Sequence, residues 1–203
     1  MLTRDVGPRL RDVHDGGEPR PSWEEILPLY AELQIDFMDV ADRARTLGTP
    51  DDRPELLPDR YVALGGDRID AVHAAAERLI NSMPLTVAHM EGHDGNIFVR
   101  DGRPVFIDWA EAVVTHPFVG PLQTLRGATE RLGYEPGSPE VERLRDLYLE
   151  PFGRFAPMTE LRELFAAGYL LHGISRAELW RRTLAPLPVE GSFQRLLRRP
   201  RVG

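Results

Sequence analysis

The segment that decides the fold reads His89-Met90-Glu91-Gly92-His93-Asp94-Gly95-Asn96, followed by IFVRDGRPVFIDW over residues 97–109. Apart from Met90, its first eight residues are polar side chains and glycines, and short apolar runs flank them on both sides. A loop this rich in hydrogen-bonding groups and glycine is a candidate functional site. Asp101-Gly102 lies between two apolar runs, which favours a two-residue β-turn. The segment therefore predicts a polar loop followed by a β-hairpin.

The turn position fixes the register of the predicted hairpin. A two-residue turn pairs residues 97–100 with residues 106–103 in order, so Ile97 lies opposite Phe106. Asn96 and Asp108 then meet at the open end of the hairpin, with Glu91 on the loop that leads into it. Magnesium binds one or two carboxylates and takes its other oxygens from substrate phosphates and water. The pattern therefore predicts that Asn96 and Asp108 hold Mg²⁺.

Helical periodicity surrounds this hairpin. Ser22-Trp23-Glu24-Glu25 has the pattern of a capping box, and an apolar stripe continues from Trp23 to Val40, with the helix ending near Gly48. Further helices are expected over residues 67–81, 122–132, from Ser138-Pro139 onward, and from Thr159 to about Leu179; residues 1–21 and 51–58 are expected to be irregular. The predicted fold class is mainly α with a small β-hairpin, an α+β domain.

Composition excludes several classes of chemistry. The 203 residues are 42% hydrophobic and 28% charged, as expected for one globular domain. The chain has no cysteine, which excludes disulfides, thiolate catalysis and iron–sulfur clusters. All 25 basic residues are arginine, so no lysine can form a Schiff base. Neither a secretory signal nor an apolar run approaching the ~20 residues of a membrane span is present, so a cytoplasmic protein with no membrane partner is expected.

The charge distribution bears on partners. The formal net charge is −7, and residues 1–100 hold 19 acidic residues against 11 arginines. An acidic half of this kind disfavours nucleic acid as a partner and suits a cationic ligand.

Other interpretations of the motif are open from the residues alone. His89 and His93 with nearby carboxylates are compatible with zinc and a hydrolase, although Gly92 and Gly95 disfavour the helix of a zinc protease. Asn96 could be a turn residue and Asp108 a cap at the end of a strand.

The motif also resembles a known family. His89-x-Glu91-x4-Asn96, the hairpin and Ile107-Asp108-Trp109 are similar to the catalytic and metal-binding loops of the aminoglycoside phosphotransferase family, which has the protein-kinase-like fold. The resemblance implies that Glu91 takes the place of the catalytic aspartate that orients the acceptor hydroxyl and accepts its proton. It also implies that Asn96 and Asp108 bind Mg²⁺ and ATP, and that His89 braces the loop.

The resemblance covers residues 1 to about 180 and includes two departures. The usual aspartate is Glu91, and neither a glycine-rich nucleotide loop nor a lysine precedes the helices. Residues 1–10 resemble the hinge between the two lobes, which places Met1 where the family holds the adenine of ATP. The expected organisation is a hinge-like lead-in over 1–21, a C-terminal lobe over 22–190 with its catalytic and metal loops at 85–109, and a basic tail over 191–203, with the N-terminal lobe absent.

The resemblance implies an ATP-dependent phosphotransferase, truncated, that transfers the γ-phosphate to a small-molecule hydroxyl with Mg²⁺. The acidic first half would suit a cationic acceptor. The alternative is a catalytically inactive kinase-like remnant that binds a ligand or a protein. In either case a separate N-terminal lobe or a second copy of the chain is an expected partner for the open face.

Overall fold

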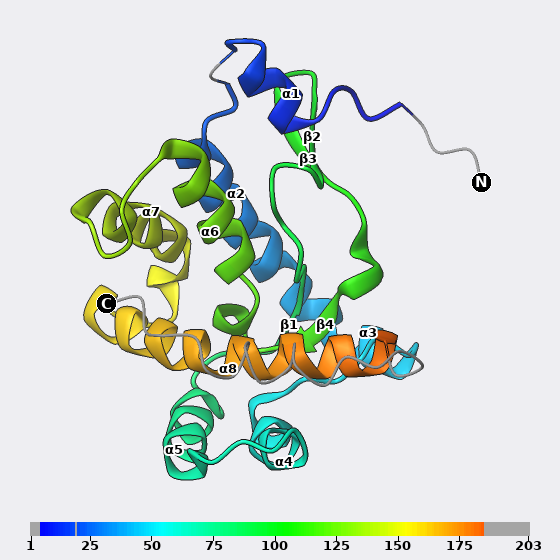
Figure 1. The fold of residues 1–203 in the computed structure, drawn as a ribbon, viewed down its shortest axis with the longest axis vertical. Helices are drawn as coiled ribbons and strands as arrows, with labels where there is room; N and C mark the ends of the chain where they lie inside the picture. The colour runs from blue at the N-terminus through cyan, green and yellow to red at the C-terminus, as the bar shows by residue number, and fades with distance from the viewer. Residues whose placement is uncertain (1–4, 19, 185–203) are drawn as a thin grey trace.

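The structure is a computed structural model that describes residues 5–18 and 20–184 (Figure 1). The α-helices are α1 (Leu10–Asp15), α2 (Trp23–Asp36), α3 (Ala41–Thr46), α4 (Leu57–Ala63), α5 (Ile69–Leu79), α6 (Leu122–Leu132), α7 (Pro139–Leu149) and α8 (Met158–Leu184). The strands are β1 (Thr86–Ala88), β2 (Ile97–Arg100), β3 (Arg103–Phe106) and β4 (Val113–Thr115). Short 3₁₀ turns are η1 (Phe37–Val40), η2 (Pro54–Leu56), η3 (Trp109–Glu111), η4 (Pro117–Val119) and η5 (Glu150–Arg154). The predicted fold class, mainly α with a small β component, is confirmed. The expected basic tail and Met1 lie outside the described residues.

Both predicted helix starts are confirmed. The Ser22 hydroxyl accepts a hydrogen bond from the backbone N–H of Glu25 at 3.3 Å, and the Glu25 carboxylate accepts one from Ser22 N–H at 2.8 Å. At α7 the Ser138 hydroxyl accepts a hydrogen bond from the backbone N–H of Val141 at 3.4 Å, with Pro139 at the first helical position. Local side-chain chemistry is therefore sufficient to set where these helices begin.

The helix predicted from Trp23 to near Gly48 is interrupted. The chain tightens into η1 at Phe37 and resumes as α3 at Ala41, and Val40 is 43% exposed rather than part of the buried stripe. Phe37 packs edge-on against Trp109, with ring centroids 5.3 Å apart. We attribute the interruption to this contact, which joins residues far apart in the sequence and therefore gives no local sequence signal.

The predicted hairpin is confirmed in every pair. β2 and β3 pair antiparallel with Arg100 opposite Arg103 and Ile97 opposite Phe106. Asp101 and Gly102 both have positive φ, 52° and 74°, as a type I′ turn requires. The turn therefore sets the register that brings Asn96 and Asp108 to one end.

A second strand pair was not predicted. β1 pairs antiparallel with β4, with Val87 opposite Val114, and Asp51 adds a parallel bridge to Val114. All three residues of β4 are buried. A three-residue strand that is buried on both faces has no alternation for a sequence pattern to reveal.

Two segments expected to be irregular contain helix. In the lead-in, α1 forms because Leu10 is buried and Arg11 binds Asp94 of the polar loop. The segment expected to be a polar loop at 51–58 holds η2 and the start of α4, where Leu57 and Tyr61 are buried. In both places a tertiary contact stabilises a helix too short to be stable alone.

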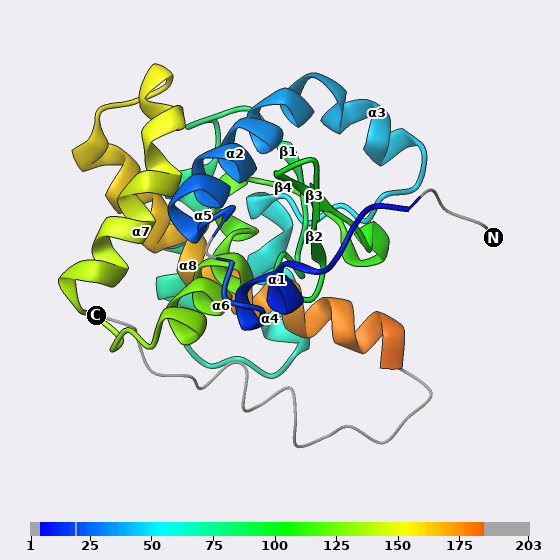
Figure 2. The same ribbon diagram turned by 90° about the horizontal axis from the view of Figure 1, so that it is seen from above.

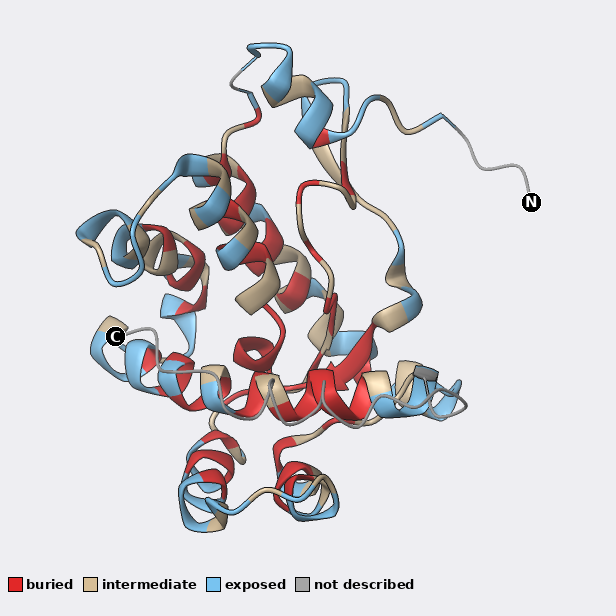
Figure 3. Ribbon diagram, viewed as in Figure 1, coloured by how far each residue is buried: buried red, intermediate tan, exposed pale blue. Residues whose placement is uncertain are grey.

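The long helix α8 packs against elements from several parts of the chain. It runs across the β1–β4 pair and packs on α4, α5 and α7 (Figures 1 and 2). Its middle, residues 171–179, is buried apart from one residue, as the burial colouring shows (Figure 3). That segment carries polar side chains into the interior, and Ser175 there donates to the fully buried Asp52. No helix in the described part of the chain is long and apolar enough to cross a membrane.

Candidate active site

His89 fixes the start of the polar loop. It directly follows β1 and is 1% exposed, and its Nε2 lies 2.7 Å from the carbonyl oxygen of Ile107. The backbone N–H of Glu91 donates to His89 Nδ1 at 3.1 Å, so Nδ1 is an acceptor and the proton must reside on Nε2. Burial lowers the pKa of His89, which keeps the ring neutral. His89 therefore ties the loop to the far strand of the hairpin, as a bracing residue would.

Asn96 joins the loop to the open end of the hairpin. Its side-chain Nδ2 donates to the carbonyl oxygen of Glu91 at 3.0 Å, and its own carbonyl accepts from Ile107 N–H at 3.0 Å. With the amide nitrogen committed to the loop, Oδ1 is the side-chain atom that Asn96 can offer to a ligand. The hairpin thus places an amide oxygen directly beside the Ile107–Asp108 peptide.

Asp108 adopts an unusual backbone conformation. It follows the hairpin with φ 62° and ψ 59°, in the left-handed region, and its side chain is exposed. Aspartate tolerates this region better than most residues, but the conformation still costs free energy. Trp109, the next residue, packs edge-on against the His89 ring with centroids 4.6 Å apart. The contact of the partly buried Trp109 with the buried His89 ring helps to hold the backbone on either side of Asp108.

Both carboxylate oxygens of Glu91 are engaged. Oε1 forms an ion pair with Nη1 of Arg176, and Oε2 lies 3.4 Å from Nε2 of His93. Arg176 belongs to α8 and is 7% exposed. Arg176 was not predicted as a site residue, because it lies far from the motif along the chain and its sequence neighbours include the polar residues Ser175 and Glu178, so no local signal marks it.

Glu111 is the second acidic partner of Arg176. Its Oε2 lies 2.9 Å from Arg176 Nη1. Burial raises the pKa of Glu111; Arg176 opposes that rise, while the negative charges of Glu91 and Asp108 add to it. Three carboxylates therefore lie near a single guanidinium, which gives this region a net negative charge.

The middle of the loop is packed tightly against α6. A Cβ added to Gly92 would lie 2.4 Å from the Thr124 hydroxyl oxygen, closer than any real contact. On the outer side, Arg11 of α1 binds Asp94 through Nη2 at 2.7 Å. The loop is therefore fixed from both sides as well as at its ends.

A cavity of about 490 Å³, ligand-sized, adjoins the loop. His93 lines it, and Nε2 of His93 lies 3.4 Å from Oε2 of Glu91, so one side chain separates the cavity from the candidate catalytic carboxylate. The other lining residues are Arg11, Asp94, Gln123, Arg126, Gly127, Glu130 and Arg131.

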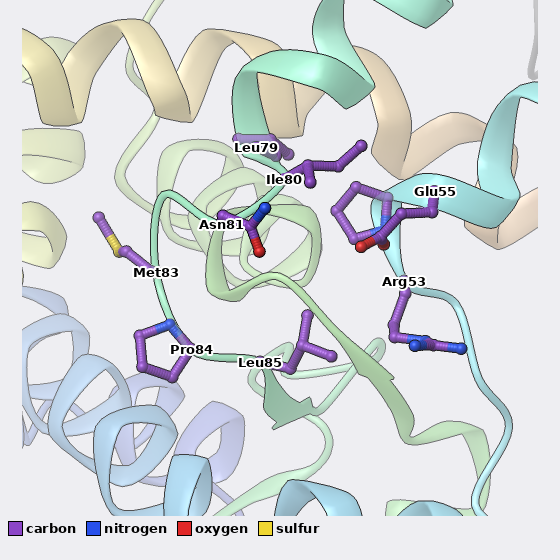
Figure 4. A pocket seen from close by; sticks show the side chains of 9 residues that line it. Arg53, Glu55, Leu79, Ile80, Asn81, Met83, Pro84 and Leu85 are labelled. Atoms are coloured by element: carbon purple, nitrogen blue, oxygen red, sulfur yellow. The ribbon is translucent and has the colours of Figure 1, made fainter.

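A second cavity of about 220 Å³ lies elsewhere, between η2 and the connection from α5 to β1 (Figure 4). Its lining includes Arg53, Glu55 and Asn81, and residues of the polar loop do not contribute to it.

The donor set at the open end of the hairpin fits magnesium. Asn96 and Asp108 offer one amide oxygen and one carboxylate, which matches an ion that takes its remaining oxygens from phosphates and water. Within residues 5–18 and 20–184, no group of three histidine, cysteine, aspartate or glutamate side chains is placed to hold an ion. Because both ring nitrogens of His89 are in hydrogen bonds, the paired zinc site with His93 is disfavoured.

The structure thus brings four of the five predicted site residues, His89, Glu91, Asn96 and Asp108, to the polar loop and the open end of the hairpin. Met1, the fifth, lies outside the described residues. Two further residues at the candidate site, Arg176 and Glu111, were not predicted from the sequence.

Comparison with known proteins identifies a family for the chain. The family model described as the phosphotransferase enzyme family, APH, matches residues 2–157. A search of curated proteins gave no match to the chain. The matched range contains the polar loop, the hairpin and Asp108, and it ends one residue before α8 begins. On the strength of a match over three quarters of its length, the chain belongs to the APH phosphotransferase family, whose fold is protein-kinase-like.

Proposed function

We propose that this chain carries the catalytic and magnesium-binding residues that transfer the γ-phosphate of ATP to the hydroxyl group of a small molecule. The observation that carries the proposal is the convergence of Asn96, Asp108 and Glu91 at the open end of one hairpin and the loop leading into it. Phosphoryl transfer asks a protein mainly for positioning and charge stabilisation, and this arrangement can supply both.

In the proposed reaction, Glu91 accepts a hydrogen bond from the acceptor hydroxyl and holds its oxygen in line with the γ-phosphorus. The new P–O bond forms as the bond to the β–γ bridging oxygen breaks, ADP leaves, and the hydroxyl proton passes to the Glu91 carboxylate. Asn96 and Asp108 would hold Mg²⁺, which neutralises charge on the phosphates when it is bound. His89, kept neutral by burial, maintains the loop geometry throughout.

Charge favours a cationic acceptor. Glu91, Asp108 and Glu111 supply three carboxylates against the guanidinium of Arg176, and the whole chain has a net charge of −7. An amine-bearing hydroxyl compound would therefore be attracted to the site, and high salt should weaken its binding.

Transfer of label from [γ-³²P]ATP to a panel of hydroxyl compounds tests the proposal. The panel should pair amine-bearing compounds with neutral and anionic compounds of similar size. We expect Mg²⁺-dependent labelling of at least one acceptor, with a preference for cations, and its loss in Asp108→Asn. The matched control is Asp101→Asn, because Asp101 is also an aspartate with positive φ but is at the hairpin tip. Labelling that persists in Asp108→Asn would contradict the metal assignment.

A second candidate is a binding module that holds a nucleotide without transferring phosphate. The observation that favours it is the engagement of both Glu91 oxygens by Arg176 and His93. This alternative predicts saturable binding of Mg·ATP, no labelled product with any acceptor, and no turnover gained by Glu91→Asp.

A further inference from the structure

Arg176 occupies a position that the motif does not account for. It is a guanidinium that is 7% exposed on α8, and it lies beyond residue 157, where the match to the family model ends. Burying an arginine requires charged or polar partners, because an unpaired buried charge is costly. Its partners therefore indicate what it does.

Those partners are concentrated on the candidate catalytic loop. Nη1 of Arg176 pairs with Oε1 of Glu91, lies 2.9 Å from Oε2 of Glu111 and is 3.4 Å from the carbonyl oxygen of Met90. The guanidinium also lies over the Trp180 ring, with its central carbon 5.4 Å from the ring centroid. The single nitrogen Nη1 therefore contacts both the backbone next to Glu91 and the carboxylate of Glu91 itself.

Glu91 is the residue that needs such a partner. It has one methylene more than the aspartate usual at this position in the motif, and a longer side chain has an additional torsion to be fixed. A misplacement of about 1 Å in a reacting group can reduce the rate on the order of 100-fold. Arg176 restrains one oxygen of the carboxylate, while Oε2 lies on the side of His93 and the 490 Å³ cavity.

We infer that Arg176 is a positioning residue, contributed by α8, that holds the Glu91 carboxylate in place for the acceptor hydroxyl. This inference rests on the proposed phosphotransfer and deepens it. In this arrangement Glu91 needs Arg176 to fix its longer side chain, and Arg176 needs Glu91 to pair its buried charge.

The test compares Arg176→Lys and Arg176→Gln with wild type in the 203-residue chain, using kcat and the KM for Mg·ATP in the labelled-phosphate assay. Lysine keeps the charge, but its side chain is shorter, so its ammonium cannot occupy the position of Nη1, and it has no planar guanidinium to lie over the Trp180 ring. We expect both variants to lose kcat on the order of 10- to 100-fold, with the KM for Mg·ATP changed by less than about threefold. The matched control is Arg181→Lys, because Arg181 lies on the same helix, is half exposed and pairs with Glu178.

A double-mutant cycle separates positioning from general stabilisation. Glu91→Asp removes the methylene and with it the reach to Arg176, so we expect Arg176→Lys to have little further effect on kcat in the Glu91→Asp background. If the two substitutions reduce kcat independently, or if Arg176→Lys keeps wild-type kcat, the inference is overturned while the proposed function survives.

Two further outcomes, an unfolded variant and an inactive wild-type chain, also bear on the inference. Thermal unfolding of each variant shows whether it is folded; if Arg176→Gln does not fold, Arg176→Lys and Glu111→Gln carry the test, since Glu111→Gln weakens one of the contacts that hold Arg176. A wild-type chain that labels no acceptor would overturn the proposed function, and the positioning role with it.

Discussion

At the residue scale, the site depends on side chains whose conformations are set by their neighbours. His89 shows this most clearly, because its two ring nitrogens join the polar loop to the hairpin and determine which tautomer is present. Asp108 shows the complementary case, in which the side chain of a candidate ligand is exposed and its backbone adopts a left-handed conformation that costs free energy.

The left-handed conformation of Asp108 leads to a prediction about stability. In the left-handed region the Cβ of alanine is sterically strained, whereas glycine has no Cβ. Asp108→Ala should therefore have a free energy of unfolding about 1 kcal/mol lower than Asp108→Gly. Urea unfolding of the two variants measures the difference. Equal stabilities, or a more stable alanine variant, would show that residue 108 does not adopt the left-handed conformation in solution.

At the element scale, the loop is held against α6 by a contact that only glycine permits. The Thr124 hydroxyl is buried without a hydrogen-bond partner among the described residues, and it lies where a Gly92 Cβ would be. Removing that hydroxyl should therefore change the free energy of unfolding little, whereas adding a methyl group to Gly92 forces the loop to move.

We predict that Gly92→Ala lowers the free energy of unfolding by about 1–3 kcal/mol and reduces phosphotransfer. Gly92→Ala combined with Thr124→Ala should recover most of both losses, because the nearest remaining atom, the Thr124 Cβ, would be 3.6 Å away. Thr124→Ala alone serves as the control. Additive losses in the double variant would mean that the loop is limited by a different contact.

Some of these elements could be predicted from the sequence and others could not. The hairpin register, the capping box at Ser22 and the start of α7 were predicted correctly, because each depends on residues adjacent in the chain. β4 and α4 were missed, because their formation depends on burial against distant segments. In the candidate site, the motif residues were proposed from their spacing and from the family resemblance, whereas the contact of Arg176 with Glu91 is visible only in the packing of α8.

At the scale of the whole molecule, the core contains histidines that fold in the neutral form. Burial lowers the pKa of His116 to about 3 and, as the main cause, that of His172 to about 4. His116 accepts a hydrogen bond from Phe118 N–H at 3.1 Å, and its Nε2 lies 3.0 Å from the Ser82 hydroxyl. In mild acid these histidines are therefore protonated in the unfolded state but remain neutral in the folded state.

The sign of the resulting pH dependence follows from this difference. The unfolded histidine takes up a proton near its ordinary pKa of about 6.5, whereas folded His116 does so near 3, so stability is full above about pH 6.5 and falls as the pH decreases towards 3. Each such histidine contributes a slope of up to about 1.4 kcal/mol per pH unit.

His116→Asn should reduce that slope in urea unfolding between about pH 6 and 4 by up to about 1.4 kcal/mol per unit, since asparagine can still cap η4 but does not titrate. The comparison with wild type at about pH 7 gives the cost of the substitution itself, separate from the slope. An unchanged slope would contradict the assignment of His116 as a buried neutral group.

The molecule as a whole presents one hairpin end where an amide oxygen, a carboxylate and the Arg176–Glu91 pair meet. The most direct test of this assembly is calorimetric titration of Mg·ATP into the purified chain, its Asp108→Asn variant and the Asp101→Asn control. We predict saturable, Mg²⁺-dependent binding to wild type and Asp101→Asn, and affinity weakened at least on the order of 10-fold in Asp108→Asn, because hydrogen bonds and ion contacts to charged groups contribute about 1.5–3 kcal/mol. Equal affinity in all three proteins, or no binding by the folded wild-type chain, would contradict the claim that Asn96 and Asp108 form a magnesium–nucleotide site.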